Sequence, residues 1–409
     1  MTIKLALIGC GGIAGHHVRS MKDLQERGRG DFVVTAVCDA NEASAREKAD
    51  MFEAFFGLRP TIYKDHQTLI SEAKVDAVDL CLPHGLHHGI AVDCMQGGLH
   101  VLCEKPLGIT IKACHLMVKT AEQTGKVLST AAPYRRLPGQ RVAHWVFNES
   151  HLIGKPLSFF HHYRRPADPP SSGNEPVPER VRWRRDKLMS GGGPVLDSGF
   201  HYCDSMRYFF GEVEKVYAEL RSLKTGAVLP FTEAPEDTVF ITFTFKNGVV
   251  GAWAWSLAAP GEEAYNVTFY GSEGSLRETT AGRFSIFHLF EHRPEQVATA
   301  RLMRADGAEY SLAQLEQMYR ATLSEETREL LYPGGATDGF SIEIWEFLEV
   351  VRGHQQKPEI DGWEGLRSLA VGEAIYESAL TGEVIYVDDI ISGKRSRFQD
   401  PIDEYWNLT

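Results

Sequence analysis

Apolar residues are spaced in two different ways along this chain, and the change between them divides it. In the first third, short apolar runs alternate with stretches in which apolar residues recur every three or four positions. Ile3–Ile8 suits a parallel strand buried on both faces, and the residues from about Ile13 to Gln25 predict the helix that follows it. Such alternation predicts a parallel sheet with right-handed crossovers. Further strands are predicted at Phe32–Cys38, Thr61–Tyr63, Val78–Leu82, His100–Cys103 and Val127–Thr130, with helices at Asn41–Phe55, His87–Gln96 and Ile111–Thr124.

After about Pro133 the period-two alternation of a half-buried sheet takes over, beyond a proline-rich loop at Pro166–Pro178. Asn247-Gly248 lies between two apolar runs and predicts a hairpin. Two amphipathic helices are predicted near the end of the chain, at Asp338–Arg352 and Gly362–Thr381. The strands predicted here are Val213–Arg221, Asp237–Phe245, Val249–Leu257 and Tyr265–Tyr270.

The two patterns predict two domains, as expected for 409 residues, which exceed what one hydrophobic core usually serves. Residues 1–133 are predicted to form an α/β domain with a doubly wound parallel sheet. Residues 134–409 are predicted to form an α+β domain with a large, mostly antiparallel open sheet. The late helices, at about 338–381, are expected to pack back toward the first domain.

Charge and cysteine usage narrow the class of partner. A formal charge of -12 argues against nucleic acid and anionic membranes, and no apolar run reaches the ~20 residues of a membrane span. The one basic run, Arg180–Lys187, is open to two interpretations, a local anion or substrate site and a solvated loop. Seven cysteines without a C-x-x-C pair, and no signal-peptide pattern, predict free thiols in the cytoplasm.

A glycine-rich turn follows the first predicted strand. Gly9 suits a tight turn, Gly11 lets the backbone approach a pyrophosphate, and the small Ala14 lets helix and strand pack closely. Asp39 ends the second strand, where its carboxylate can accept from ribose hydroxyls. Because that charge repels a 2′-phosphate, NAD is predicted over NADP, although Arg46 keeps NADP open. The residues predicted to bind the dinucleotide here are Gly9, Gly11, Gly12, Ile13, Ala14 and Asp39.

Three polar residues are candidates for the chemistry. Lys105 follows a buried strand, and ligands of open α/β sheets bind at the carboxyl ends of strands. If the chain is helical from Leu196, Asp197 and His201 are one turn apart on one face. His201 is then predicted to be the base for a hydroxyl proton, oriented by Asp197. Lys105 would stabilise alkoxide charge, or share the base role if burial depresses its pKa. The alternative for His201 is a satisfied core histidine. Asp204, a turn away from the pair, is predicted to be structural.

Three histidines follow the predicted strand Val78–Leu82 and raise the possibility of a metal site. His84, His87 and His88 lack a cysteine or carboxylate at a matching offset, so we predict no metal and assign them to the start of a helix on the nicotinamide side. The cofactor residues predicted on that side are Pro83, His84, His87, Glu104 and Lys105.

At these motifs the sequence resembles the glucose–fructose oxidoreductase, inositol dehydrogenase and MocA family over nearly the whole chain. The likeness includes Glu104-Lys105-Pro106, Asp197 with His201, and the run Asp361–Arg367. It departs at His84, where the family often has Asn. The resemblance implies an NAD(P)-binding Rossmann domain, a catalytic group at Lys105, Asp197 and His201, and action on cyclitols, sugars or glycosides. It also implies homodimers or homotetramers that pair through the open sheet.

Four further residues are predicted to bind the substrate. Tyr134 and Arg135 follow the last strand of the nucleotide-binding domain and are expected to line the cleft between domains, unless they form a packed linker. Trp183 and Arg184 resemble a pocket-lining element of sugar-active family members, and an aromatic face beside hydrogen-bond donors suits a polyhydroxylated ring.

The function predicted is hydride transfer between nicotinamide and a secondary hydroxyl of a sugar, cyclitol or glycoside. One alternative is a lyase or glycosidase that uses tightly held NAD in a transient ring oxidation. Another is a non-catalytic dinucleotide sensor, against which the complete set of Lys105, Asp197 and His201 argues.

Overall fold

The computed structural model of the chain describes residues 2–164, 179–223, 235–258, 261–280, 286 and 299–408. Its N-terminal part contains a six-stranded sheet in the order β3-β2-β1-β4-β5-β6, in which every pair of neighbours is parallel. This is the strand order of a dinucleotide-binding Rossmann sheet, so the predicted α/β class is confirmed. The strands are β1 (Ile3–Ile8), β2 (Phe32–Cys38), β3 (Thr61–Tyr63), β4 (Ala77–Leu80), β5 (His100–Glu104) and β6 (Leu128–Ala131).

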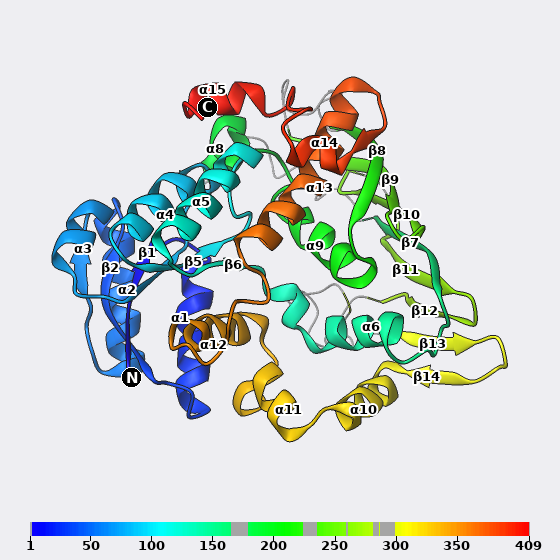
Figure 1. Cartoon of the computed structure of the whole chain (residues 1–409), viewed down its shortest axis with the longest axis horizontal. Helices are drawn as coiled ribbons and strands as arrows, with labels where there is room; N and C mark the ends of the chain where they lie inside the picture. Colours follow the sequence, from blue (N-terminus) through cyan, green and yellow to red (C-terminus); the bar gives the residue numbers. More distant parts are fainter. Residues whose placement is uncertain are drawn as a thin grey trace.

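Helices cover both faces of this sheet because its strands are apolar on both sides (Figure 1). In β1, Leu5 and Leu7 join the apolar cluster under the first two helices, whereas Ala6 and Ile8 join the cluster under the fourth and fifth. The alternation places each successive side chain on the opposite face. The elements are α1 (Ala14–Glu26), α2 (Glu42–Phe56), α3 (His66–Glu72), the 3₁₀ turn η1 (His84–Leu86), α4 (His87–Gln96) and α5 (Ile111–Thr124).

The C-terminal part contains a nine-stranded sheet in the order β14-β13-β12-β11-β7-β10-β9-β8-β15. Its neighbours are antiparallel except for β7 and β10, which confirms the predicted mostly antiparallel sheet. The strands are β7 (Pro156–Arg164), β8 (Val213–Arg221), β9 (Thr238–Phe245), β10 (Val250–Ser256), β11 (Ala264–Gly271), β12 (Gly274–Glu278), β13 (Arg301–Arg304), β14 (Glu309–Ser311) and β15 (Ile385–Tyr386).

The predicted Asn-Gly hairpin joins β9 to β10. Gly248 has φ +90°, and the backbone N–H of Phe245 donates to the Val249 carbonyl at 2.9 Å. The Asn247 side chain accepts from the Val249 N–H at 3.1 Å. A glycine is needed at the third turn position because side chains rarely adopt a positive φ. The predicted loop Pro166–Pro178 lies outside the described residues.

The two faces of the large sheet differ. On the inner face, Phe159 of β7 stacks on Phe210 at 5.5 Å, and Phe269 packs against Phe147 at 4.9 Å. Helices therefore cover this side, as Figure 1 shows for α6, α9 and α13. The outer face exposes large apolar side chains. The helices between and after the strands are η2 (Pro133–Arg136), α6 (Pro138–Asn148), α7 (Glu179–Arg182), η3 (Trp183–Arg185), α8 (Lys187–Ser190), α9 (Gly199–Phe210), α10 (Leu312–Thr322), α11 (Glu325–Leu331) and η4 (Pro333–Gly335).

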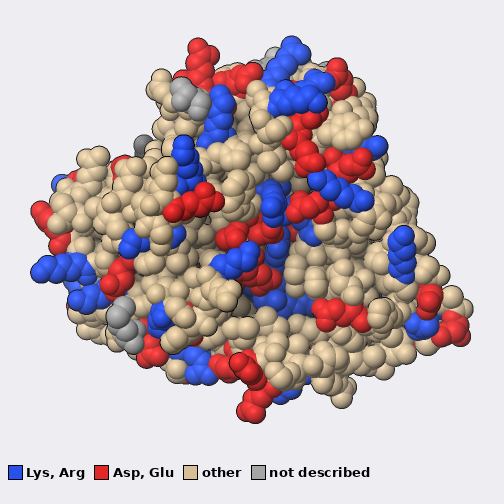
Figure 2. All heavy atoms as spheres, viewed as in Figure 1, with Lys and Arg blue, Asp and Glu red and all other residues tan. Residues whose placement is uncertain are grey.

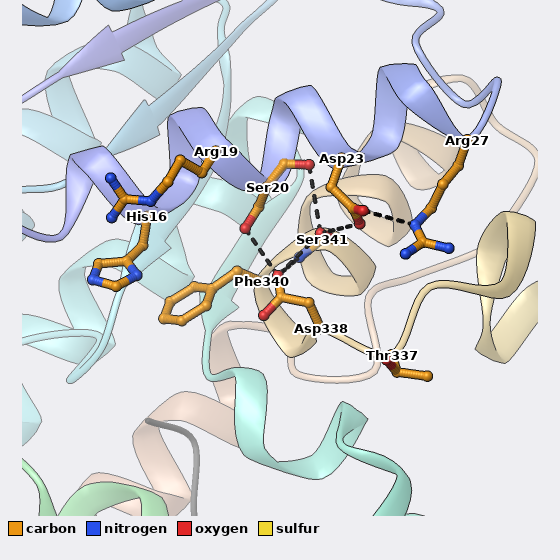
Figure 3. A pocket seen from close by; sticks show the side chains of 9 residues that line it. All are labelled: His16, Arg19, Ser20, Asp23, Arg27, Thr337, Asp338, Phe340 and Ser341. Carbon is orange, nitrogen blue, oxygen red and sulfur yellow. Dashed lines mark hydrogen bonds and ion pairs between the residues drawn. The ribbon is translucent and has the colours of Figure 1, made fainter. Parts of the chain in front are cut away.

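The late helices return to the Rossmann sheet. α12 (Gly339–Val351) packs along α1, and α13 (Gly362–Thr381) contacts both α5 and α9. Ser20 of α1 donates to Asp338 at 2.9 Å, and Ser341 donates to Asp23 at 2.9 Å. The residues that make these bonds line a cavity of about 300 Å³ between α1 and α12 (Figure 3). None of the predicted site residues lines this cavity. The last helices are α14 (Val387–Ile391) and α15 (Asp400–Tyr405).

Two surface properties bear on the partners. Figure 2 shows acidic and basic side chains interspersed over the face of the molecule drawn there. A protein that binds nucleic acid usually has its basic side chains concentrated on one face instead. Among the described residues, no helix has the length and apolar character that a membrane span requires.

Candidate active site

The glycine turn between β1 and α1 has the shape that a dinucleotide needs. Gly9 has φ +88°, and a Cβ there would lie 2.3 Å from the Cys81 carbonyl oxygen, so only glycine fits. Gly11 and Gly12 are exposed, and a Cβ on either would meet nothing within 4 Å. Ala14, fully buried, begins α1. The turn therefore leaves backbone open to a ligand at the positive end of a helix.

Asp39 supports this turn from the end of β2. Its Oδ2 accepts from the Cys10 N–H at 2.7 Å, and its Oδ1 accepts from the Asn41 N–H at 2.7 Å. Each carboxylate oxygen has two acceptor sites, so one on each remains for a ribose hydroxyl. Arg46, the cation that kept NADP open, donates to Glu42 at 3.1 Å. The residues present fit a dinucleotide whose ribose is unphosphorylated.

Lys105 and Asp197 meet at the end of β5, although 92 positions separate them. The Lys105 ammonium donates to Asp197 Oδ1 at 2.8 Å and to the Asp197 carbonyl at 3.0 Å. Arg184 Nε donates to the other carboxylate oxygen at 2.9 Å. Burial opposes the charge on Asp197, but its neighbours, with Lys105 first among them, outweigh burial and hold the pKa of Asp197 far below the ordinary value. Asp197 is therefore ionised, with one cation on each oxygen.

His201 lies close to this pair but is not oriented by it in the predicted way. The expected spacing on one helix face required a helix from Leu196, but α9 begins at Gly199, so Asp197 lies in the preceding turn. Both Asp197 oxygens are bonded to cations. The His201 ring instead stacks on Tyr134, with centroids 4.3 Å apart and planes 10° apart. Burial, and then the Lys105 charge, lower the pKa of His201 well below its ordinary value, so the ring is neutral.

His84 belongs to the Asp197 cluster. Its Nδ1 lies 2.8 Å from the Ser190 carbonyl, and its Nε2 lies 3.9 Å from Asp197 Oδ1. The Trp183 ring meets it edge-on at 4.6 Å. Burial lowers the pKa of His84 to about 3, so it contributes no charge. Trp183 and Arg184 are thus brought to the catalytic candidates by contacts of their own.

Two predicted cofactor residues point into the protein instead. His87 is fully buried, with its ring nitrogens 2.9 Å from the carbonyls of Pro106 and Leu82, so neither nitrogen is left for a cofactor. Glu104 is also buried, and its carboxylate contacts His17 and the Lys105 backbone. These contacts point both side chains into the protein, because a strand end carries inward-facing side chains as well as outward-facing ones. Pro83, half-buried, precedes η1.

Arg135 was predicted to line the substrate cleft, and the structure places its guanidinium elsewhere. It donates to both oxygens of the buried Asp204, at 2.8 and 2.6 Å, and to Glu364 at 3.1 Å. The bidentate pair joins η2 to α9, and Glu364 links both to the start of α13. A buried carboxylate needs such a partner, so these contacts favour a structural role for Arg135 and Asp204. Tyr134 differs from its neighbour by facing His201.

A buried acid that the sequence did not single out holds the glycine loop before Asp197. Glu236 Oε1 accepts from the Val195 N–H at 2.8 Å and from the Tyr376 hydroxyl at 2.6 Å. That hydroxyl in turn accepts from the Gly193 N–H at 2.7 Å. Burial raises the pKa of Glu236 to about 7. Its position next to Asp237 at a strand start gives no sign of burial, so only the fold reveals it.

Replacing Glu236 with glutamine is expected to make stability less sensitive to pH. An unfolded glutamate titrates near 4.5, so between about pH 4.5 and 7 the folded chain keeps a proton that the unfolded chain has lost. The contribution of this group is complete below that range and is lost as the pH rises through it. The Tm of Glu236→Gln minus that of the wild type should therefore rise from pH 5 to pH 8. Glu325→Gln, at an exposed position, is the control. A pH-independent difference would contradict the assignment.

The fold and the site define an oxidoreductase with a Rossmann domain for a nicotinamide dinucleotide. Residues 3–132 match the oxidoreductase family described as having an NAD-binding Rossmann fold, and residues 149–388 match its C-terminal alpha/beta domain. The chain belongs to this glucose–fructose oxidoreductase, inositol dehydrogenase and MocA family, which confirms the resemblance.

Individual relatives agree with this family. The levoglucosan dehydrogenase of Pseudarthrobacter phenanthrenivorans is 31% identical over 87% of this chain and 85% of its own length. The 1,5-anhydro-D-fructose reductase of Ensifer adhaerens is 27% identical over 79% of this chain and 83% of its own. The aldose-aldose oxidoreductase of Caulobacter crescentus, solved with glycerol, shares the fold with a TM-score of 0.70 at 19% identity, covering 94% of this chain and 100% of that one.

Proposed function

We propose that this protein transfers a hydride between NAD and a secondary hydroxyl of a sugar, cyclitol or glycoside, with Lys105, Asp197 and His201 as the acid–base group. The observation that carries the proposal is the 2.8 Å ion pair between Lys105 and Asp197 at the end of β5, next to a neutral His201. Open parallel sheets bind their ligands at this edge, outside the carboxyl ends of the strands. The relatives named above include a dehydrogenase and a reductase of carbohydrates, in line with this substrate class.

Each residue has a separate task in the proposal. A nicotinamide bound next to these residues would supply the carbon that exchanges hydride with the substrate. His201, neutral because its pKa is lowered, accepts the hydroxyl proton during oxidation. The Lys105 ammonium donates to the substrate oxygen and stabilises developing negative charge. Asp197 keeps the ammonium in place, and Tyr134 fixes the plane of the His201 ring through their stacking at 4.3 Å.

Arg184 and Trp183 extend the site toward the substrate. Arg184 lies 4.7 Å from the centre of the Trp183 ring and is partly exposed beyond its bond to Asp197. An aromatic face and a guanidinium next to the reacting groups suit a polyhydroxylated ring. The NAD preference follows from Asp39, whose carboxylate disfavours a ribose phosphate.

One assay tests the proposal. Purified protein is incubated with NAD or NADP and a panel of cyclitols, aldoses, anhydrosugars and glycosides, while nicotinamide absorbance and products are both followed. Net NAD reduction with one of these substrates is the expected result. Product formation without net reduction would instead select the lyase or glycosidase alternative. Dinucleotide binding without turnover of any substrate in the panel would favour a sensor.

The outer face of the large sheet supports a homo-oligomer. Phe160 and Phe240 are 54% and 60% exposed there, and Tyr270 and Met303 lie on the same face. A face with this much exposed apolar surface is typical of a protein interface, and a second copy of this chain is the proposed occupant.

The seven buried free thiols suit the cytoplasm.

Phe160→Lys together with Phe240→Lys is expected to reduce the mass of the wild-type oligomer, measured by light scattering after size exclusion, toward that of one chain. A charged side chain would have to be buried without a partner in the interface. Leu58→Lys, at an apolar position 45% exposed after α2, should leave the mass unchanged. A wild-type protein that runs as a monomer would refute this interface.

A further inference from the structure

A chain of buried charges runs beneath the candidate site. His17 of α1 places its Nδ1 2.8 Å from Asp79 Oδ2 and its Nε2 3.0 Å from Glu104 Oε1. Exposed fractions are 0% for His17, 1% for Asp79 and 4% for Glu104. Burial opposes charge on the ring, but the facing Asp79 outweighs it and raises the pKa of His17 well above the ordinary value. The ring is therefore an imidazolium that donates to both carboxylates.

The series of buried charged side chains ends at the backbone of Lys105. The second oxygen of Glu104, Oε2, accepts the Lys105 backbone N–H at 3.0 Å. Each oxygen of Glu104 thus has a different partner, so the carboxylate cannot turn without losing one of them. Beyond this backbone bond, the Lys105 side chain extends to Asp197.

The three residues come from elements that meet at the cofactor site. His17 lies one turn into α1, the helix that starts at the glycine turn, whereas Asp79 is on β4 and Glu104 ends β5. We propose that Asp79, His17 and Glu104 form a positioning unit that fixes the Lys105 backbone relative to the cofactor-binding helix. The proposal rests on the proposed function, because it assigns these residues to positioning its lysine.

A metal site is the main competing interpretation. Ligand atoms of His17, Asp79 and Cys81 lie within 4.8 Å of one another. Both His17 nitrogens, however, are bonded to carboxylates. Burial also raises the pKa of the Cys81 thiol, which disfavours the thiolate that a metal binds. The arrangement is that of an ion-paired imidazolium.

A second buried acid near these residues provides a control. Burial raises the pKa of Glu343 of α12 well above its ordinary value, although Arg136 and His17 oppose this shift. It is fully buried, and Arg136 lies 3.7 Å from it. No hydrogen bond connects Glu343 to Lys105 among the described residues. Glu343→Gln therefore changes a second buried acid that interacts with His17 without touching the Lys105 backbone.

Glu104→Gln is the first test. The amide keeps the shape of the side chain, but it offers one acceptor where His17 and the Lys105 N–H need two. We expect kcat to fall about 10- to 100-fold, since small displacements of catalytic groups cost this much. The Kd of NADH, measured by fluorescence, should change less than about threefold because the glycine turn is intact. Glu343→Gln should retain kcat within about threefold.

A second measurement does not depend on turnover. Lys105 is labelled with trace acetic anhydride and quantified by mass spectrometry against exposed Lys74 in the same molecule. Glu104→Gln should raise the relative rate by at least about threefold, as the ammonium loses its fixed place beside Asp197, whereas Glu343→Gln should not. Asp79→Asn, more distant from Lys105, replaces Glu104→Gln if the latter does not fold.

The kcat values and the labelling rate of Lys105 together distinguish failure of the proposed function from failure of the positioning unit. A wild type without dehydrogenase activity but with the expected labelling difference would overturn the proposed function and keep the positioning unit. Equal losses of kcat in Glu104→Gln and Glu343→Gln, or unchanged kcat and labelling in Glu104→Gln, would overturn the positioning unit.

Discussion

Replacing Lys105 with alanine is expected to lower kcat by about two to four orders of magnitude, the combined size of lost acid–base and electrostatic catalysis. The physical reason is that the ammonium is held 2.8 Å from Asp197 at the end of β5, the edge of the sheet where ligands of open α/β sheets bind. The variant also leaves Asp197 with Arg184 as its remaining cation at hydrogen-bond distance among the described residues. Steady-state kinetics with NAD and the substrate found in the panel assay would measure the loss.

The control for this prediction is cofactor binding. The glycine turn and Asp39 do not contact the Lys105 side chain in the structure, so the NADH Kd of Lys105→Ala should stay within about threefold of the wild type, a difference below 1 kcal/mol. Lys246→Ala, which removes an exposed lysine paired with Asp388, should leave both kcat and Kd unchanged. Wild-type turnover in Lys105→Ala would refute its catalytic role.

Replacing Arg135 with alanine is expected to destabilise the protein by about 3–5 kcal/mol, the usual cost of leaving a buried charge unpaired. Asp204 is fully buried, and its carboxylate accepts two hydrogen bonds from this guanidinium. Ser368 then remains as a partner at 2.8 Å, which does not neutralise the charge. Denaturant unfolding would measure the change in the free energy of unfolding.

The double variant Arg135→Ala with Asp204→Ala separates a structural role from a substrate-binding role. Removing both partners eliminates the unpaired charge, so the double variant should recover part of the stability lost by Arg135→Ala. The KM of the folded fraction for substrate should change little in either variant. Unchanged stability with a much higher KM would reinstate Arg135 as a pocket residue.

Local pattern predicted most of the fold. The apolar runs predicted the observed bounds of β1 and β2, and the period-two alternation predicted those of β8. The helix predicted at Gly362–Thr381 is α13. These predictions succeed because burial on one or both faces imposes a periodicity that the chain itself displays. The glycine turn was predictable for a similar reason, since Gly9 occupies a backbone conformation that other residues rarely adopt.

The partners of polar side chains were less predictable. Glu104 and Lys105 are adjacent, yet one side chain points into the protein and the other toward the site. Arg135 and Tyr134 are also adjacent and face Asp204 and His201 respectively. Asp79, a carboxylate inside the apolar strand β4, is the one signal that a buried polar network exists, because a charge is rarely buried without a partner.

Sequence alone therefore predicted the two-domain class, the dinucleotide turn and the place of Lys105 directly after β5. All three depend on short-range periodicity and backbone conformation. Folding decided which charges meet. Lys105 contacts Asp197 across 92 positions, and His17 contacts Glu104 across 87. Such pairs depend on how β5, α1 and the turn before α9 pack together, and a hydrogen bond reaches only about 3 Å, so a change of packing too small to alter the periodicity would separate them.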